Sequence, residues 1–142
     1  MNAGEPETAP AWPGLWGRDA EGAYLVAGRC ERCGGQALGL REFCPHCHAA
    51  GTLREVRAGR TGHLYSATVI HQGPGGFSTP YRVGYIDFEG GMRVFAHLEN
   101  GPAAPQIGDR VTLDIRPLAA DKQGRSMTVP FYARQPGAGK TP

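Results

Sequence analysis

Four cysteines in two closely spaced pairs are the residues of this 142-residue chain whose types and spacing most clearly predict chemistry. The pairs are Cys30 with Cys33 and Cys44 with Cys47, and ten residues separate them. A spacing of two residues lets one tight turn direct both sulfur atoms at one point, and two facing turns complete the tetrahedron that zinc prefers. A single pair can be a redox site, but two such pairs are seldom one. The sequence therefore predicts one structural zinc ion whose four thiolate ligands leave no position for a reacting water molecule.

Residues next to the cysteines support two turns of this kind. Gly34 and Gly35 follow the first pair, and glycine readily adopts the positive φ that such a turn often requires. His46 and His48 flank the last cysteine and could replace a cysteine ligand, but we expect both to lie outside the coordination shell. A module of this size is too small to fold through its own core, so we expect the metal to stabilise it.

The remaining histidines do not belong to a recognised catalytic motif. His63, His71 and His97 lie in or beside predicted strands, where a single histidine is more often a surface residue than a base. No nucleophile motif surrounds the nearby serines, and the glycine-rich segment 73–76 lacks the Lys-Ser/Thr of a phosphate-binding loop. We therefore expect that the chain alone is not an enzyme. An independent thioester enzyme that depends on one of these histidines is an alternative.

Aromatic and arginine side chains offer a binding surface instead. Small barrels often stack flat ligands on aromatic rings, and a guanidinium group matches the geometry of a phosphate. Two tryptophans near the N-terminus are either packed on the protein or docked on a partner, since tryptophan is enriched at interface hot spots. The residues that we assign to an acyl-CoA or partner surface are Trp12, Trp16, Phe77, Tyr81, Arg93, Phe95 and His97.

The elements that must position these residues are mainly β-strands. A strand over 24–29 leads into the first cysteine pair, and the short segment before it is expected to be helical. Alternation of apolar and polar residues between turn signals predicts five further strands, over 64–71, 81–88, 92–98, 110–116 and 126–132. Five short strands in about 70 residues indicate a small closed barrel, for which the OB type is the natural candidate.

Charge and hydropathy argue against two classes of function, nucleic-acid binding and membrane spanning. The formal net charge is +2, and the basic residues are scattered, which disfavours the clustered positive field that nucleic-acid binding requires. A nucleic-acid-binding zinc-ribbon and OB module is nevertheless an alternative, because both folds serve that role. No segment approaches the ~20 apolar residues of a membrane span. We expect a soluble protein of the reducing cytoplasm, where paired cysteines bind metal, with no nucleic-acid or membrane partner.

Several motifs occur in an order and spacing that resemble a known family, from about Trp16 to Tyr132. They are Cys30-x-x-Cys33-Gly34, Cys44-Pro45-x-Cys47, Gly62-x-Leu64-Tyr65-Ser66-x-Thr68-Val69, Phe77-x-x-Pro80-Tyr81-x-Val83-Gly84-Tyr85-Ile86, Glu89-Gly90-x-x-Arg93-Val94-Phe95-Ala96, Ile107-Gly108-Asp109-x-Val111 and Pro130-Phe131. By these motifs the chain resembles the bacterial and archaeal proteins that combine a zinc ribbon with an OB fold and associate with acyl-CoA enzymes. Segments 71–77 and 93–98 look most like members paired with thiolases of aromatic-compound breakdown.

The resemblance implies a fold and a function. The fold is mainly β, with an N-terminal helical segment, a rubredoxin-like zinc ribbon and a C-terminal five-stranded OB-type barrel. The corresponding divisions are a flexible tail and partner-docking segment at 1–23, the ribbon at 24–52, the barrel at 53–134 and a flexible tail at 135–142. Family members form hetero-oligomers with thiolase-like catalytic subunits such as thiolases, aldolases and acyltransferases. The implied role is that of a non-catalytic zinc-containing subunit that assembles the partner and shapes its acyl-CoA site.

Overall fold

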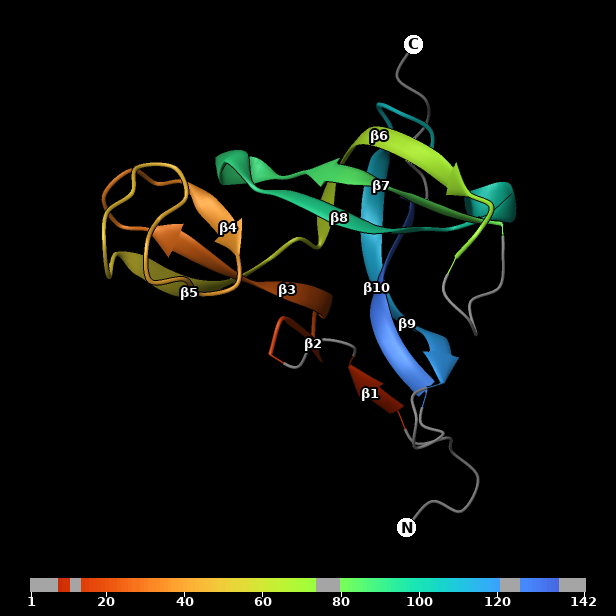
Figure 1. The fold of residues 1–142 in the computed structure, drawn as a ribbon, viewed down its shortest axis with the longest axis horizontal. Coiled ribbons are helices and arrows are strands. Elements are labelled where there is room, and N and C mark those ends of the chain that lie inside the picture. The colour runs from red at the N-terminus through yellow and green to blue at the C-terminus, as the bar shows by residue number, and fades with distance from the viewer. Residues whose placement is uncertain (1–7, 11–13, 74–79, 121–125, 136–142) are drawn as a thin grey trace.

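The computed structural model describes residues 8–10, 14–73, 80–120 and 126–135, which form a small ribbon module beside a β-barrel (Figure 1). The described residues contain no α-helix; their helical elements are two one-turn 3-10 helices, η1 (Glu89–Gly91) and η2 (Gly101–Ala103). Neither has the length that a membrane crossing requires. Several features expected from the sequence lie outside the described residues: the N-terminal tail up to residue 7, Trp12, Phe77 and the C-terminal tail from residue 136.

Five strands close into the barrel that the sequence predicts. Each strand pairs antiparallel with its neighbours, except that β8 and β10 are parallel, and the closed order is β6-β7-β8-β10-β9. This connectivity is that of an OB barrel, so the prediction of the barrel is confirmed. The strands are β6 (Thr61–Ile70), β7 (Tyr81–Asp87), β8 (Arg93–Leu98), β9 (Arg110–Ala120) and β10 (Ser126–Arg134).

Alternation along the strands determines which side chains fill the barrel and which face outward. The inward-facing side chains are almost completely buried: Leu64, Ile86, Met92, Val94, Ala96, Leu98, Val111, Leu113 and Tyr132. A bulge in β6 between Leu64 and Ser66 leaves Tyr65 exposed. Gly84 pairs with Ala67 next to this bulge, and a Cβ there would lie 2.1 Å from the Ser66 carbonyl oxygen, so only glycine allows the two strands this approach. The outer face of β6, β7 and β8 consequently carries several exposed aromatic rings.

The ribbon module is a second sheet built around one long strand. β3 (Gly22–Cys30) is its central strand, and the three others pair antiparallel to it: β2 (Trp16–Asp19), β4 (Gln36–Leu38) and β5 (Leu53–Ala58). Because β5 pairs with β3, residues 53–58 are hydrogen-bonded into the ribbon sheet before the chain enters the barrel. The division of the chain at residue 53 stays a prediction.

The helical segment expected before the ribbon is not found in the described residues, which form strands instead. Thr8–Pro10 (β1) pairs in parallel with β10, and Trp16–Asp19 forms a hairpin with the start of β3. Gly14 and Gly22 bound this segment with φ values of 86° and 113°, which a helix does not accommodate. The backbone groups of β2 bond to β3, so tertiary pairing replaces the local hydrogen bonds of a helix.

A short buried linker joins the ribbon to the barrel. Gly59 has a φ of 75°, and the buried Tyr132 hydroxyl donates a 2.6 Å hydrogen bond to its carbonyl oxygen. Leu113 donates its amide to the Arg60 carbonyl oxygen at 2.9 Å. The linker is therefore held by the barrel and does not act as a free hinge.

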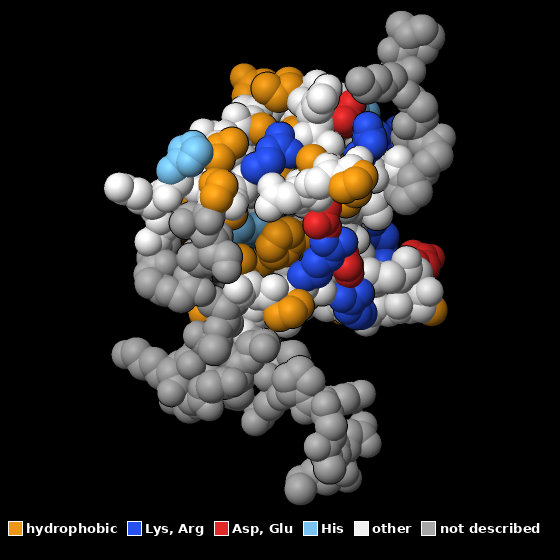
Figure 2. Space-filling model, turned by 90° about the vertical axis from the view of Figure 1, so that its right-hand side faces the viewer, with side chains coloured by type: hydrophobic (Ala, Val, Ile, Leu, Met, Phe, Trp, Pro, Cys, Tyr) orange, Lys and Arg blue, Asp and Glu red, His pale blue; other side chains and the backbone are white. Residues whose placement is uncertain are grey.

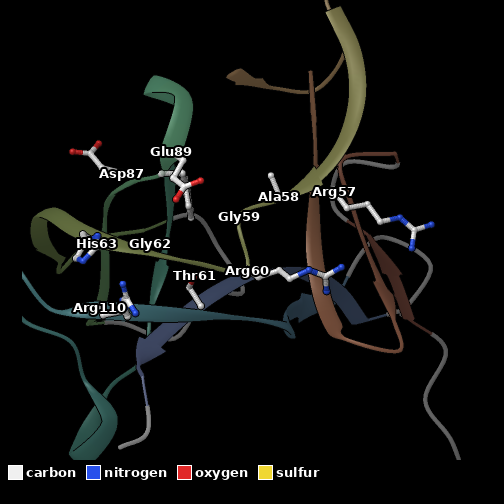
Figure 3. Close-up of a pocket in the computed structure, with 11 residues that line it drawn as sticks. Arg57, Ala58, Gly59, Arg60, Thr61, Gly62, His63, Asp87, Glu89 and Arg110 are labelled. Atoms are coloured by element: carbon white, nitrogen blue, oxygen red, sulfur yellow. The ribbon is translucent and has the colours of Figure 1, made fainter. Parts of the chain in front are cut away.

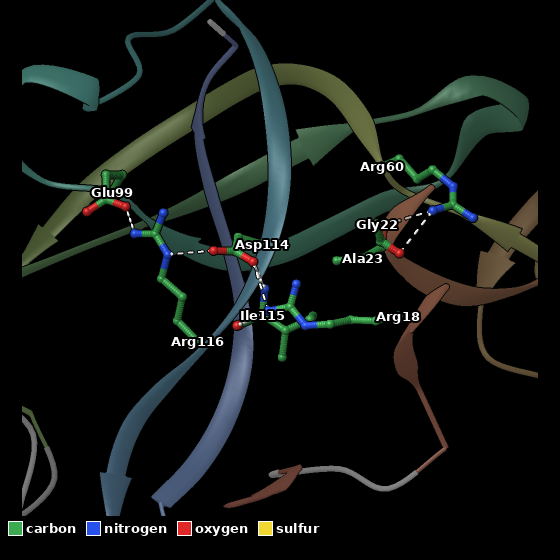
Figure 4. A network of polar contacts seen from close by, with 8 residues as sticks. All are labelled: Arg18, Gly22, Ala23, Arg60, Glu99, Asp114, Ile115 and Arg116. Carbon is green, nitrogen blue, oxygen red and sulfur yellow. Dashed lines mark hydrogen bonds and ion pairs between the residues drawn. The ribbon is translucent and has the colours of Figure 1, made fainter. Parts of the chain in front are cut away.

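Polar contacts of two arginines, Arg60 and Arg18, reinforce the junction at two places (Figure 4). Arg60 reaches back to the ribbon, where its guanidinium bonds Asp19 Oδ2 at 2.6 Å and the Gly22 carbonyl oxygen at 3.1 Å. Arg18 of β2 reaches the barrel, where it bonds Asp114 Oδ1 at 2.9 Å and the Ile115 carbonyl oxygen at 2.6 Å. These contacts set the orientation of the two modules.

Candidate metal centre and the surfaces beside it

The four cysteines that the sequence singles out come together in space. Their sulfur atoms all lie within 4.8 Å of one another, and the Cys30–Cys47 and Cys33–Cys44 Sγ pairs are each 3.7 Å apart. A tetrahedral site with Zn–S bonds of about 2.3 Å requires sulfur atoms about 3.8 Å apart, whereas a disulfide requires about 2.05 Å. The donor set therefore fits a tetrahedral thiolate-bound metal such as zinc, and the four cysteines could hold such an ion.

Two turns of the same kind place the sulfur atoms. The Gly34 amide donates to the Cys30 carbonyl oxygen at 2.9 Å, and the His48 amide donates to the Cys44 carbonyl oxygen at 2.8 Å. Both turns end in positive φ, 78° at Gly34 and 66° at His48. His48 is the only described non-glycine residue with positive φ, so the second turn carries a backbone cost that the first avoids.

Backbone amides also point at the sulfur atoms, which suits thiolates. Arg32 and Cys33 donate to Cys30 Sγ at 3.3 and 3.4 Å, and Gly35 donates to Cys33 Sγ at 3.3 Å. In the second turn His46 donates to Cys44 Sγ at 3.4 Å. Such donors stabilise negative charge on sulfur, and they would orient the ligands before a metal binds.

The surroundings shift the pKa values of three of the thiols, and not all in the same direction. The Thr52 hydroxyl, 3.2 Å from Cys30 Sγ, together with the Cys33 and Arg32 amides lowers the pKa of Cys30 to about 6. The Gly35 amide opposes the shift at Cys33, but desolvation and the neighbouring thiols raise the pKa of that residue to about 11. The Cys47 and His46 amides lower the pKa of Cys44. A divalent cation would displace the remaining protons, because only the thiolate is a ligand.

His46 lies between the metal cluster and the barrel. Its Nε2 is 2.8 Å from the Gln36 carbonyl oxygen, and its ring occupies the space where a Cβ at Gly35 would lie, 2.5 Å from its Cδ2. On the barrel side a Cβ at Gly91 would lie 3.2 Å from its Cε1. The metal cluster of the described residues contains cysteines alone, so His46 contacts both modules as a neighbour of the site.

A groove of about 400 Å³ lies between the ribbon and β8, next to His46. Arg93 and Phe95, two residues assigned from sequence to a ligand or partner surface, line it on the barrel side. Arg93 forms an ion pair with Asp87, and its guanidinium carbon lies 3.7 Å from the centre of the Tyr65 ring. Phe95 is 58% exposed and packs against Tyr85 with ring centroids 5.2 Å apart.

Tyr81 and His97, also assigned from sequence to that surface, belong to a separate aromatic cluster. The His97 ring lies 5.4 Å from Tyr81 and stacks on Phe131 at 5.1 Å, centroid to centroid. Burial lowers the pKa of His97, so its ring is favoured in the neutral form. Arg116 adjoins the cluster over Phe131 and is neutralised by ion pairs with Asp114 and Glu99. Figure 2 shows one face of the molecule, on which hydrophobic side chains lie beside neighbouring cationic and anionic groups.

Trp16, the remaining described residue of that set, is half-buried and packs against the core of the protein. The side chains assigned to one surface thus fall into three places: the junction of β2 with the core, the aromatic cluster at His97, and the groove at Arg93. Their roles stay predictions.

A larger cavity of about 530 Å³ at the linker was not expected from the sequence (Figure 3). Its charged lining is mixed and contains both basic and acidic side chains: Arg57, Arg60, His63, Arg110, Asp87 and Glu89. Arg57 and Arg60 both bond Asp19, so much of their charge is compensated. The sequence does show basic residues around Gly59, among them Arg57 and Arg60. Their charge state in the fold depends on Asp19, however, which is about 40 residues away in the chain.

Comparison with known proteins identifies the family to which this fold belongs. Residues 55–116 match the family described as the C-terminal OB-fold domain of ChsH2. The chain is 33% identical over 106 residues to benzoylsuccinyl-CoA thiolase subunit BbsA of Thauera aromatica, which covers 75% of this chain and 73% of BbsA. The chain belongs to the ChsH2-type OB-fold (DUF35) family. The resemblance that the motifs indicate is thereby confirmed.

Two further relatives show the range of this DUF35 family. A DUF35 domain-containing scaffold protein of Methanocaldococcus jannaschii is 28% identical over 109 residues, covering 75% of this chain and 77% of that protein. Among solved structures, the Ltp2-ChsH2(DUF35) aldolase matches with a TM-score of 0.58 and 32% identity, covering 77% of this chain and 83% of that chain. The relatives are thus named as a subunit, a scaffold and a component of an aldolase.

Proposed function

We propose that this chain is a non-catalytic, zinc-containing subunit of a thiolase-like acyl-CoA complex. Two relatives support the proposal by their names, a subunit of benzoylsuccinyl-CoA thiolase and the DUF35 chain of an aldolase with Ltp2. In this role the chain forms a hetero-oligomer with a catalytic partner in the cytoplasm. The partner carries the reacting groups, and this chain assembles it and shapes its acyl-CoA site.

The arrangement of the four sulfur atoms is the observation that carries the structural part of this proposal. Four thiolates complete a tetrahedral zinc site and leave no position for water or substrate, so the metal acts in folding and not as a Lewis acid. It joins two turns that otherwise share only a small buried cluster of Cys30, Cys44 and Leu53. The folded ribbon then presents a rigid surface beside the barrel for the partner subunit.

A more specific form of the proposal concerns the substrate. The similarity to BbsA favours a benzoylsuccinyl-CoA thiolase small subunit, and so a role in aromatic-compound degradation. In this form the acyl-CoA or partner surface includes Trp12, Trp16, Phe77, Tyr81, Arg93, Phe95 and His97. The exposed ring of Phe95 and the adjacent rings of Tyr81 and His97 support a contact with a flat acyl group or with the partner.

Co-production of the tagged chain with a thiolase-like protein from the same organism tests the proposal. We expect a stoichiometric complex in size-exclusion chromatography, one zinc per chain by elemental analysis, and thioester turnover that requires both proteins. Turnover by the isolated chain would favour the independent thioester enzyme. Binding to nucleic acid that weakens steeply with salt, without a protein partner, would favour the nucleic-acid module.

A further inference from the structure

We propose that the groove between the ribbon and β8 binds an acidic segment of the catalytic subunit, with Arg41 and Phe95 as its principal contacts. The inference rests on the proposed function, because the occupant is part of that partner. It adds the surface on this chain and the chemistry of the segment that fits it.

Residues of both the ribbon and the barrel line the groove. Leu38 and Pro45 line it on the ribbon side, and Met92 and Val94 line it on the barrel side. Met92 and Val94 are buried, and Leu38 packs against the barrel core, so the floor is rigid and apolar. Its volume of about 400 Å³ accommodates a few side chains of a docked segment.

The charge of the groove selects an anionic occupant. Its ionisable lining consists of Arg41, His46 and Arg93, and no acidic side chain of the described residues lines it. Arg93 is already neutralised by Asp87 and lies on the Tyr65 ring. Arg41 makes no ion pair or side-chain hydrogen bond with the described residues, so its guanidinium is available for a carboxylate.

Exposed apolar side chains neighbour the lining residues of the groove on both modules, which favours a polypeptide over a small anion. On the barrel side Phe95 is 58% exposed, and Tyr85 and Tyr65 beyond it are 44% and 55% exposed. On the ribbon side Leu40 and Phe43, which flank Arg41 in the sequence, are each 55% exposed. Aromatic residues and arginine are the types enriched at protein interfaces, and a stable interface covers about 800 Å² on each partner, more than one depression provides.

Two substitutions test the groove without disturbing either core. Arg41→Glu reverses the available charge, and Phe95→Ala removes an exposed ring. Each should weaken binding of the catalytic subunit, immobilised for interferometry, by about tenfold or more, and Arg41→Glu should also flatten the salt dependence of binding. The matched controls are Arg29→Glu, at an exposed arginine outside the groove, and Ile107→Ala, at a side chain 66% exposed elsewhere on the barrel. Both controls should bind within about twofold of wild type.

Hydrogen exchange on the wild-type complex locates the contact independently. Amides over 36–46 and 91–95 should gain protection when the catalytic subunit binds. Unchanged binding of both groove variants would overturn the inference and leave the proposed function intact. Failure of the wild-type chain to bind any thiolase-like subunit would overturn both. Protection of the same amides by acetyl-CoA alone, lost in Arg41→Glu while assembly persists, would show a small-anion site and would also overturn the inference.

Discussion

The tip of the ribbon and the barrel are stabilised by different means, although both are built from short strands. The barrel encloses a continuous core that includes Leu64, Ile86, Leu98 and Tyr132, each 0–1% exposed. The hydrophobic cluster at the ribbon tip is far smaller and consists of Cys30, Cys44 and Leu53. A cluster this small cannot offset the conformational entropy of about 20 ordered residues, so we expect the tip to require a metal ion for folding.

The two modules are nevertheless not independent, because β3 belongs to both. Its first half contributes Ala23, Leu25 and Ala27 to the barrel core, and its end contributes Cys30 to the metal cluster. The strand therefore has a hydrophobic anchor and a metal anchor about five residues apart. Loss of metal should consequently release the tip while the base of the ribbon stays on the barrel.

Removal of one sulfur ligand should have the largest effect and test that division directly. Cys30→Ser removes one of the four ligands and should abolish stoichiometric zinc binding. The module should then lose the folding free energy that structural zinc supplies, which is of the order of 10 kcal/mol. Amides over 30–52 should then exchange rapidly, whereas those of β7 and β8 should stay protected. Chelation of the wild-type chain serves as the control and should reproduce this pattern. Full zinc content in the variant would show that Cys30 is not a ligand.

A large-to-small substitution in the barrel core should destabilise the barrel and leave the metal site of the ribbon intact. Leu98→Ala removes a side chain that is 1% exposed, and the lost burial together with the cavity should cost about 2–5 kcal/mol of unfolding free energy. Denaturant unfolding followed by tryptophan fluorescence measures this loss. Zinc content should be retained below the transition. Zinc release that coincides with the unfolding transition of the barrel would mean that the two modules unfold as one unit.

The two metal-binding turns provide a smaller and internally matched test. At Gly34 an added Cβ meets no atom within 4 Å, so Gly34→Ala isolates the cost of positive φ, about 1 kcal/mol. His48→Gly relieves that cost in the second turn, partly offset by the greater entropy of unfolded glycine. Competition with a chelator should show weaker zinc binding for Gly34→Ala and equal or tighter binding for His48→Gly. Equal weakening in both would show a specific role for the His48 side chain.

Protonation of Asp19 at acidic pH should weaken the junction between the modules. This effect should be the smallest of those predicted here. Hydrogen bonds from Arg60, and then from Arg57, hold the pKa of Asp19 below its ordinary value. A depressed carboxyl pKa stabilises the folded state above about pH 4, the ordinary value, and this stabilisation is lost as the pH falls towards the folded pKa. Asp19→Asn should therefore be less stable than wild type at pH 6, and the difference should shrink between about pH 4 and pH 2.

This direction is checked by measuring the unfolding free energies of wild type and Asp19→Asn at each pH with the same denaturant. Protonation of the cysteine ligands affects both proteins alike, so only the difference between them is informative. A constant difference down to about pH 2 would show that the Asp19 carboxylate does not titrate with folding.

The features that can be predicted from the sequence are those set by residues close together in the chain. A two-residue spacing defines each metal-binding turn, so all four cysteines of the cluster are identifiable from their spacing. Alternation such as that of Met92, Val94, Ala96 and Leu98 predicts a strand and its inward face, and five such strands predict the barrel.

Features that depend on distant partners are set by the tertiary structure. Residues 16–19 form a strand because β3 supplies their hydrogen bonds, and residues 53–58 join the ribbon for the same reason. The groove exists because loop 41–46 lies next to segment 91–95, which is about 50 residues away in the sequence. Local spacing specifies ligand turns and strand faces, whereas pairing between remote strands is chosen by the packing of the whole chain, which no local pattern encodes.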